Sequence, residues 1–326
     1  MKNLFILSTP PHYYNLLQYI EQFEVNTKDS ELLFLSSFFT PDKIMDDFIN
    51  KYIDKSEWKS VRRISLWQTK FKKIYSPSNL FKIFLLLFNI FLFYSFRKYN
   101  HLVVNQVDQS YCKFFYIFVS FNKLIALDEG NDVFRISHNR IHNTKSNLFM
   151  PKKIIFFSSY KIDVKEPDIL IECKNLYSKK IIKDRKINKN ETFFIGSPYL
   201  DDGLIEEDIY YKYIDKIRKD FENTNIKYFP HRRENEKNLS ILKNNYNFLI
   251  QRIDIPIELY FLKINISPEV IIGFSSNALF SLKKLSNDNT LVRSYYISAK
   301  NLHSFSDELI QIKKQYKYAG IEVLDL

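Results

Sequence analysis

Residues 225–234 read NIKYFPHRRE, a β-prone run that ends in a proline and a cluster of charges. Pro230 has no backbone N–H to donate to a neighbouring strand, so a strand over 225–229 is expected to stop there. The histidine and arginines that follow then lie on a loop at the carboxyl end of a strand. Open α/β sheets bind ligands at that edge, so this stretch predicts both a fold class and the place of a site.

The loop brings together three potential cations, His231, Arg232 and Arg233. An arginine offers a two-pronged donor to a phosphate, and a histidine offers a single donor whose charge depends on its surroundings. A phosphate site is one interpretation. The other is a solvated basic loop, because runs of charge usually face water.

Outward from this loop, apolar runs of strand length alternate with stretches of helical periodicity. Strands are expected at 3–8, 31–36, 60–66, 101–105, 123–127, 153–157, 168–172, 192–195, 225–229, 247–250, 270–272, 290–296 and 321–324. Helices are expected at 12–23, 41–53, 81–96, 109–120, 205–221, 256–263, 277–285 and 304–316, with Thr40 as the cap of the second. Such alternation predicts parallel sheets that are covered by helices on both faces.

The chain has 326 residues, which is enough for two domains with a large core. We expect two Rossmann-like domains facing a central cleft, one over residues 1–150 and one over 151–326. The polar stretch 131–147 is expected to contain the exit from the first domain. The last helix is expected to pack back on the N-terminal domain.

The formal net charge of +11 predicts attraction to anionic surfaces such as phosphate headgroups or acidic glycans. No nucleic-acid-binding motif is visible, so nucleic acid is not an expected partner. Cys112 and Cys173 are too few and too far apart for a metal cluster, and lone thiols fit a reducing cytoplasm. The first apolar run, residues 4–7, is too short for the core of a signal peptide.

The most hydrophobic segment is residues 81–96, FKIFLLLFNIFLFYSF. Lys82 and Asn89 interrupt it, and it falls short of the roughly 20 apolar residues that a membrane span needs. A buried helix and an interfacial membrane helix are both compatible with this pattern. Because lysine and arginine flank the segment, we expect a cytoplasmic protein that lies peripherally at the inner face of an anionic cytoplasmic membrane.

Glycine is rare, with only 5 in the chain, so its positions near predicted strand ends are informative. Residues 127–130 read LDEG, where Asp128 could act as a general base or could cap a helix. Residues 195–205 read IGSPYLDDGLI, where the backbone amides and Ser197 could meet a nucleotide, or the segment could be only a turn and a cap.

Two further segments lie in the second half. Residues 273–277 read GFSSN before a helix, which suits a phosphate at the helix N-terminus or a serine that only caps the helix. Glu258 follows Pro256-Ile257 at the start of another helix. It could accept hydrogen bonds from a ribose diol, or it could be a first-turn acid that the helix dipole favours.

The order of these motifs resembles that of bacterial sialyltransferases, closest to glycosyltransferase family 52. That family has an acidic-acidic-glycine motif, a His-Pro motif and a Ser/Thr motif in this order. Ser8-Thr9-Pro10 resembles its opening loop, and residues 195–205 resemble its Ile-Gly-x-Pro-x-x-x-Asp-Gly-Leu-Ile segment. One departure is Arg232, which stands where the family has the proline of its His-Pro-Arg sequence.

The resemblance implies a GT-B type fold and an inverting transfer of a nonulosonic acid from a CMP-sugar, with no metal and no other cofactor. The acceptor would be a surface glycan or glycolipid of a capsule or lipooligosaccharide. Asp128 then resembles the general base, with Asp201 as the substitute where the base lies in the Gly-x-Pro loop. His231 resembles the catalytic residue that meets the phosphate, either as a general acid or as a charged donor. The residues implied for the CMP-sugar are Gly196, Ser197, Pro198, His231, Arg232, Arg233, Glu258, Ser275 and Ser276.

Two alternatives stay open. One is a GT-B enzyme that uses a UDP- or GDP-sugar. The other is a membrane-peripheral binding protein without catalysis, organised around residues 81–96.

Overall fold

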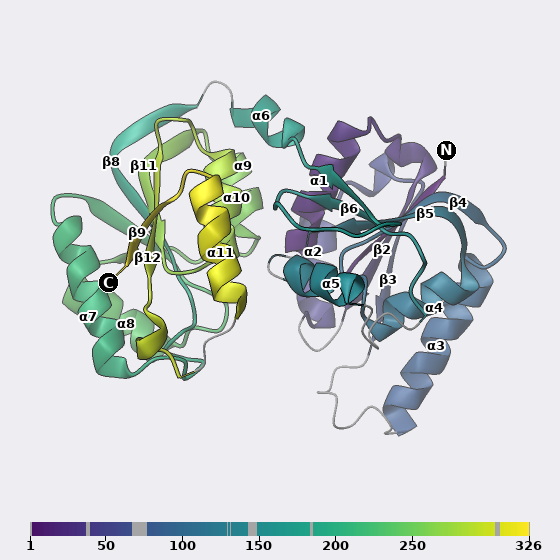
Figure 1. Ribbon diagram of the computed structural model, residues 1–326, viewed down its shortest axis with the longest axis horizontal. Coiled ribbons are helices and arrows are strands. Elements are labelled where there is room, and N and C mark those ends of the chain that lie inside the picture. The colour runs from purple at the N-terminus through teal and green to yellow at the C-terminus, as the bar shows by residue number, and fades with distance from the viewer. Residues whose placement is uncertain are drawn as a thin grey trace. The chain divides into compact units, whose positions relative to one another are not determined.

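The computed structural model describes residues 2–36, 40–66, 77–128, 130, 132–142, 149–182, 185–303 and 307–325. The chain divides into two compact units, Met1–Tyr177 and Ser178–Leu326. Each unit contains one parallel sheet with helices packed against it (Figure 1). The expected α/β class with two Rossmann-like domains is confirmed.

The N-terminal sheet has seven strands in the order β3-β2-β1-β4-β5-β6-β7. Its strands are β1 (Asn3–Leu7), β2 (Glu31–Ser36), β3 (Ser60–Ser65), β4 (Lys98–Val104), β5 (Ser120–Leu127), β6 (Ile155–Ser158) and β7 (Ile169–Glu172). Its helices are α1 (Pro11–Gln22), α2 (Asp42–Tyr52), α3 (Pro77–Phe93), α4 (Ser110–Phe118) and α5 (Asp132–Ile141), with short 3-10 turns at Thr27–Asp29 and Lys55–Glu57. Right-handed crossovers place α1 and α2 on one face and the other three helices on the opposite face.

The C-terminal sheet has six strands in the order β10-β9-β8-β11-β12-β13. Its strands are β8 (Lys186–Ile195), β9 (Asn225–Phe229), β10 (Leu249–Ile250), β11 (Ile266–Gly273), β12 (Leu291–Tyr296) and β13 (Glu322–Asp325). Its helices are α7 (Glu207–Asp220), α8 (Glu236–Tyr246), α9 (Ile257–Lys263), α10 (Asn277–Leu285) and α11 (Asp307–Tyr318), with a 3-10 turn at Ala299–Asn301. Helix α6 (Leu176–Ile182) spans the division between the units. In Figure 1, α7 and α8 lie on one side of this sheet and α9, α10 and α11 on the other.

The cores explain why the central strands are continuous apolar runs. All five residues of β1 and all six of β2 are buried, as expected for strands covered on both faces. In the C-terminal unit, the ring of Phe194 makes edge contacts with Tyr228 at 5.0 Å and with Phe274 at 5.6 Å between centroids. These aromatic contacts pack the ends of β8, β9 and β11 together directly beneath the loops of interest.

The structure corrects several expectations about the organisation of the chain. The division falls after Tyr177 and not near residue 150, because β6 and β7 pair with β5 and complete the N-terminal sheet. The last helix, α11, packs against β13 and α10 within the C-terminal unit. The polar stretch 131–147 contains α5, and the predicted cap Thr40 is buried while Pro41 precedes α2 without a side-chain cap.

The thiols of Cys112 and Cys173 are both buried. Among the residues that the structure describes, no helix combines the length and apolar character that a membrane crossing requires.

Candidate functional site

Three of the predicted motifs follow neighbouring strands of the C-terminal sheet. Ile195 pairs with Phe229, and Gly273 pairs with Ile195, so β9, β8 and β11 end level with one another. Because the strands are parallel, the loops that begin at Pro230, Gly196 and Phe274 leave the same edge side by side. This edge is the candidate ligand site of the unit.

Gly196 is required by close packing at that edge. Its N–H donates to the carbonyl of Phe229 at 2.8 Å. A side chain at position 196 would place its Cβ against a carboxylate oxygen of Glu234, 2.8 Å from the hydroxyl of Tyr228 and 2.9 Å from the Phe229 carbonyl. The glycine therefore allows the end of β8 to lie against the loop after β9.

Glu234 closes the 231–234 turn from the inside. Its buried carboxylate accepts hydrogen bonds from the Tyr228 hydroxyl and from the backbone N–H of His231, and its own N–H donates to the His231 carbonyl at 3.0 Å. Burial raises the pKa of Glu234 to about 7, although the Tyr228 hydrogen bond acts in the opposite direction. The sequence analysis assigned Glu234 no role. The one feature that could have pointed to it is that it is an acidic residue on an otherwise cationic loop.

His231 is half-buried, and its ring is oriented by its own loop. Burial lowers the pKa of His231 to about 4, and the adjacent Arg233 and Arg232 add to the effect. The Nδ1 atom accepts from the N–H of Arg233 at 3.3 Å. A neutral ring that accepts at Nδ1 carries its proton on Nε2, so His231 can present one N–H donor to a ligand oxygen.

The acidic pair of the 195–205 segment lies beside the same loop. The guanidinium of Arg233 forms an ion pair with Asp202 at 2.8 Å, and Arg232 is exposed. The Asp201 carboxylate accepts hydrogen bonds from the amides of Asn235 and Asn238, the second at 3.0 Å. Asn235 caps α8, so Asp201 holds the start of that helix.

The two serines after β11 have different environments. Ser276 is the N-cap of α10, and its hydroxyl accepts from the N–H of Ala278 at 3.3 Å. Its backbone is held by Tyr316, whose hydroxyl accepts from the Ser276 N–H at 2.8 Å and donates to its carbonyl at 2.5 Å. The capping interpretation therefore describes the Ser276 side chain. The carbonyl of Ser275 accepts from the Tyr199 hydroxyl at 3.4 Å.

The other residues that the sequence predicts for the nucleotide follow β8 and β10 of the same sheet. Ser197 is buried directly after Gly196, and Pro198 is half-buried. Glu258 is in the first turn of α9, which packs against α10. Burial raises the pKa of Glu258, and a hydrogen bond with Ser281 of α10 acts in the opposite direction.

Asp128 lies in the N-terminal unit, at the carboxyl end of β5. It is 6% exposed, and one carboxylate oxygen accepts from the N–H of Ser159 at 2.7 Å. Its backbone carbonyl accepts from the side-chain amide of Asn15 at 2.9 Å. These bonds fix Asp128 between the segment after β6 and helix α1.

Two residues that sequence reasoning missed lie along the same edge of the N-terminal sheet. His12 is buried at the start of α1, where burial lowers its pKa to about 3, and the Thr9 hydroxyl lies 2.9 Å from its Nδ1 atom. The side-chain amide of Asn105 contacts the Ser8 hydroxyl at 3.1 Å and His12 at 3.2 Å. Ser8, Asn105 and Asp128 follow β1, β4 and β5, which are neighbours in the sheet.

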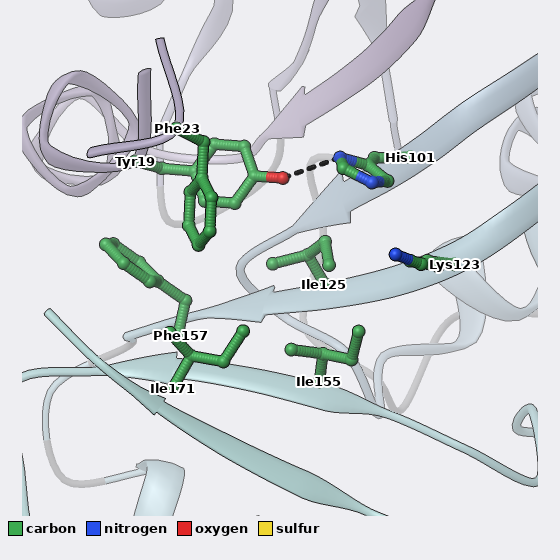
Figure 2. A pocket seen from close by; sticks show the side chains of 8 residues that line it. All are labelled: Tyr19, Phe23, His101, Lys123, Ile125, Ile155, Phe157 and Ile171. Carbon is green, nitrogen blue, oxygen red and sulfur yellow. Dashed lines mark hydrogen bonds between the residues drawn. The ribbon is translucent and has the colours of Figure 1, made fainter. Parts of the chain in front are cut away.

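A cavity of about 140 Å³ lies elsewhere, on the sheet face that α1 covers (Figure 2). It is mostly apolar, and none of the predicted site residues lines it. At its edge the Tyr19 hydroxyl and the Nδ1 atom of His101 are 2.7 Å apart. Among the described residues, no group of three or more His, Cys, Asp or Glu side chains is arranged to hold a metal ion.

These two sheets and their connections define the GT-B fold. Over 99% of this chain and 93% of the other, the structure is similar to E. coli heptosyltransferase WaaC with ADP-2-deoxy-2-fluoro heptose, at 8% identity and a TM-score of 0.50. It is also similar to UDP-GlcNAc 2-epimerase from Methanocaldococcus jannaschii, at 13% identity and a TM-score of 0.50 over 97% and 92% of the two chains. A third similar structure is UDP-GlcNAc 2-epimerase from Neisseria meningitidis bound to UDP-GlcNAc, at 10% identity and 0.50 over 99% and 95%.

At these identities the likeness concerns the fold. No protein-family model matches the chain, and a search of curated protein sequences finds no match.

Proposed function

We propose that the chain is an inverting glycosyltransferase that moves a nonulosonic acid, such as a sialic or pseudaminic acid, from its CMP ester to a hydroxyl of a surface glycan. The main support for this proposal is that β9, β8 and β11 end at the same level of the sheet. The loops that contain His231, Gly196 and Ser275 therefore lie at one edge. The E. coli and N. meningitidis proteins with similar folds were solved with a nucleotide-sugar analogue and with UDP-GlcNAc, which supports a nucleotide-sugar site in this fold.

On the donor side, the phosphate of CMP needs hydrogen-bond donors and positive charge as the bond to the sugar breaks. His231 supplies its Nε2–H, and a bound phosphate would raise the pKa of the ring from about 4 towards protonation. Arg232 is exposed beside it and adds a charged donor. The N-terminus of α10 and Ser275 complete a set of donors that suits a phosphate.

On the acceptor side, a base removes the proton of the attacking hydroxyl. That oxygen then bonds to the anomeric carbon, and the electron pair of the breaking carbon–oxygen bond leaves on the CMP phosphate. We assign the base to Asp128 and not to Asp201, because two asparagine amides already engage the Asp201 carboxylate at the start of α8. The Ser159 amide would hold the Asp128 carboxylate in position.

A thermal-shift screen with CMP, UDP, GDP and ADP tests the donor. CMP is expected to raise the melting temperature most, since a ligand at 100 times its Kd stabilises a fold by about 2.7 kcal/mol. A larger shift with UDP or GDP would indicate that the enzyme uses that nucleotide sugar and not a CMP-sugar. This alternative stays open because Arg232 stands where the family has a proline. No shift with any nucleotide would favour a binding protein without catalysis.

A further inference from the structure

Helix α3 carries large apolar side chains on the face that points away from the sheet. They are between 36% and 77% exposed, and they lie on α3, three residues beyond its end, and at the end of α4. They are Phe81, Phe84, Leu85, Phe88, Phe91, Leu92, Phe96, Ile117 and Phe118. The α3 positions repeat at three- and four-residue spacings, so they form one continuous side of the helix. A soluble helix normally keeps that side polar, and a contiguous apolar patch of this kind marks an interaction surface.

The opposite side of α3 is anchored to the N-terminal unit. Leu86, Ile90 and Tyr94 are buried, and the Tyr94 ring lies 6.0 Å from that of Phe115 in α4. The guanidinium of Arg62 on β3 lies 3.8 Å from the centre of the Phe93 ring. The exposed stripe is therefore held in a fixed direction.

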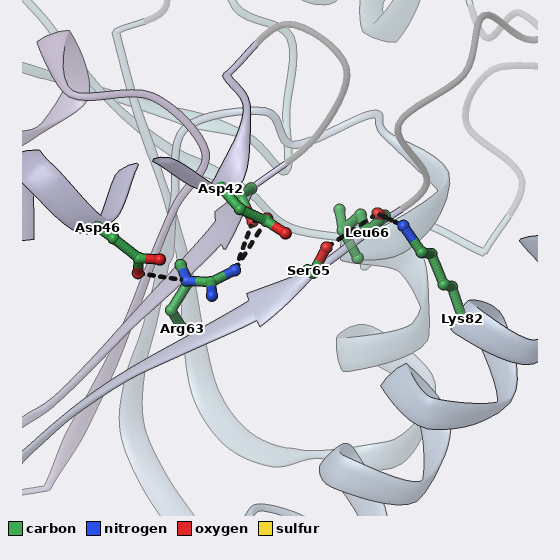
Figure 3. A network of polar contacts seen from close by, with 7 residues as sticks. Asp42, Asp46, Arg63, Ser65, Leu66 and Lys82 are labelled. Carbon is green, nitrogen blue, oxygen red and sulfur yellow. Dashed lines mark hydrogen bonds and ion pairs between the residues drawn. The ribbon is translucent and has the colours of Figure 1, made fainter. Parts of the chain in front are cut away.

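The start of the helix is also tied to the sheet. Lys82 donates from its ammonium to the carbonyl of Leu66 just after β3, at 3.2 Å (Figure 3). On the same strand, Arg63 is held by ion pairs with Asp42 at 2.8 Å and Asp46 at 2.6 Å. The Lys82 hydrogen bond therefore ties the first turns of α3 to the end of β3, and the Arg63 ion pairs tie β3 to α2.

The stripe continues onto α4. Lys98 at the start of β4 pairs with Ser120 at the start of β5. Phe96 and Phe118 each lie two residues before these paired positions, so they precede neighbouring strands. Figure 1 shows α3 and α4 next to each other on the outside of the N-terminal unit. The exposed rings of both helices therefore belong to one surface.

The charge of this region identifies the partner. In residues 77–122 the single acidic residue is Asp108, which lies in an ion pair with Arg135 at 2.6 Å. The basic side chains there are Lys82, Arg97, Lys98 and Lys113, of which Arg97 is paired with the buried Glu31 at 2.5 Å, and the whole chain carries +11. A second copy of so basic a chain would bring like charges together, whereas an anionic bilayer attracts them.

We propose that α3 and the end of α4 dock on an anionic lipid bilayer, with the exposed rings in the interfacial layer and α3 lying along the surface. Aromatic and leucine side chains on one face, with lysines beside them, are the composition of interfacial helices. This docking is independent of the proposed sugar transfer, and it would bring the N-terminal unit to lipid-linked acceptors.

Co-sedimentation of the full chain with lipid vesicles tests the docking. The vesicles are equal parts of phosphatidylglycerol and phosphatidylcholine, with pure phosphatidylcholine as the comparison. The test variant is Phe84→Gln with Phe88→Gln and Phe91→Gln, all exposed on α3. The matched control replaces exposed apolar residues of other elements, Ile44→Gln with Phe149→Gln and Leu249→Gln.

The wild type and the control are expected to sediment with the anionic vesicles, more than with phosphatidylcholine. The α3 variant should lose at least about tenfold in partitioning, because three buried phenyl rings exceed the 1.4 kcal/mol that a factor of ten represents. Circular dichroism spectra that match the wild type would establish that the variant is folded.

Equal binding of the α3 variant and the wild type would overturn the docking, as would a wild type that does not bind. A wild type that self-associates, is not bound by vesicles and becomes monomeric in the α3 variant would also overturn it, in favour of contact between copies. No nucleotide or sugar enters the assay, so its outcome does not depend on the transfer reaction.

Discussion

Replacing Glu234 with glutamine should change how the stability of the protein depends on pH. The carboxylate is buried, and burial raises the pKa of Glu234 from 4.5 to about 7. Below pH 4.5 this carboxyl is protonated in both the folded and the unfolded chain, so its contribution is fully present. As the pH rises through about 7, the unfolded chain ionises more easily than the folded one, and stability is lost.

The size of the effect follows from the two pKa values. A difference from 4.5 to about 7 at 1.36 kcal/mol per pH unit corresponds to a loss of about 3 kcal/mol in the free energy of unfolding. Glutamine has nearly the same shape and does not ionise. The stability of Glu234→Gln, taken relative to the wild type, should therefore rise by about 3 kcal/mol between pH 4.5 and pH values just above 7.

Urea unfolding at both ends of this range measures the difference. Glu236→Gln is the matched control, because that acid is exposed two residues further on. Subtracting the free energy of unfolding of the wild type from that of the variant removes the contributions of other titrating groups, including His12 and His231. A Glu234→Gln variant that follows the wild-type pH dependence would refute the assigned burial of this carboxyl.

Three further predictions concern the two candidate edges. Gly196→Ala should destabilise the fold by about 1–3 kcal/mol in urea unfolding, because its Cβ would press on Glu234 and the Phe229 carbonyl; an unchanged midpoint would contradict this packing. His231→Gln should lose stability relative to the wild type as the pH rises from about 4 to 6.5, since the folded chain favours the neutral ring; no relative change would contradict the burial. Asp128→Asn should lower turnover at least about 100-fold with unchanged nucleotide binding, as loss of a general base does, whereas Asp201→Asn should chiefly destabilise α8; the reverse pattern would move the base to Asp201.

The local sequence pattern predicted most of the helices and strands. The strand at Glu31–Ser36, the strand at Asn225–Phe229 and the helix at Asn277–Leu285 were predicted with the bounds observed, because apolar runs bounded by polar residues and prolines specify them. The domain boundary could not be read in this way. The short strands β6 and β7 have the same pattern whichever sheet they join, and only their pairing with β5 assigns them.

The sequence could predict which residues of the candidate site lie at strand ends, but not which of them are neighbours. His231, Gly196 and Ser275 could be placed at strand ends from sequence, but the order of the strands made them neighbours. Glu234, His12 and Asn105 were missed, because their significance comes from burial and from partners distant in the sequence. The capping role of Ser276 was left open, since a serine before a helix reads the same whether or not it also binds a ligand.

Release of CMP from CMP-sialic acid by the wild type and by His231→Ala is the most direct measurement of the proposed reaction. We predict that the wild type releases CMP in the presence of a glycan acceptor and that the variant has almost no turnover. Near-normal turnover in the variant, or release of UDP from a UDP-sugar with none of CMP, would contradict a cytidylate leaving group held at the His231 loop.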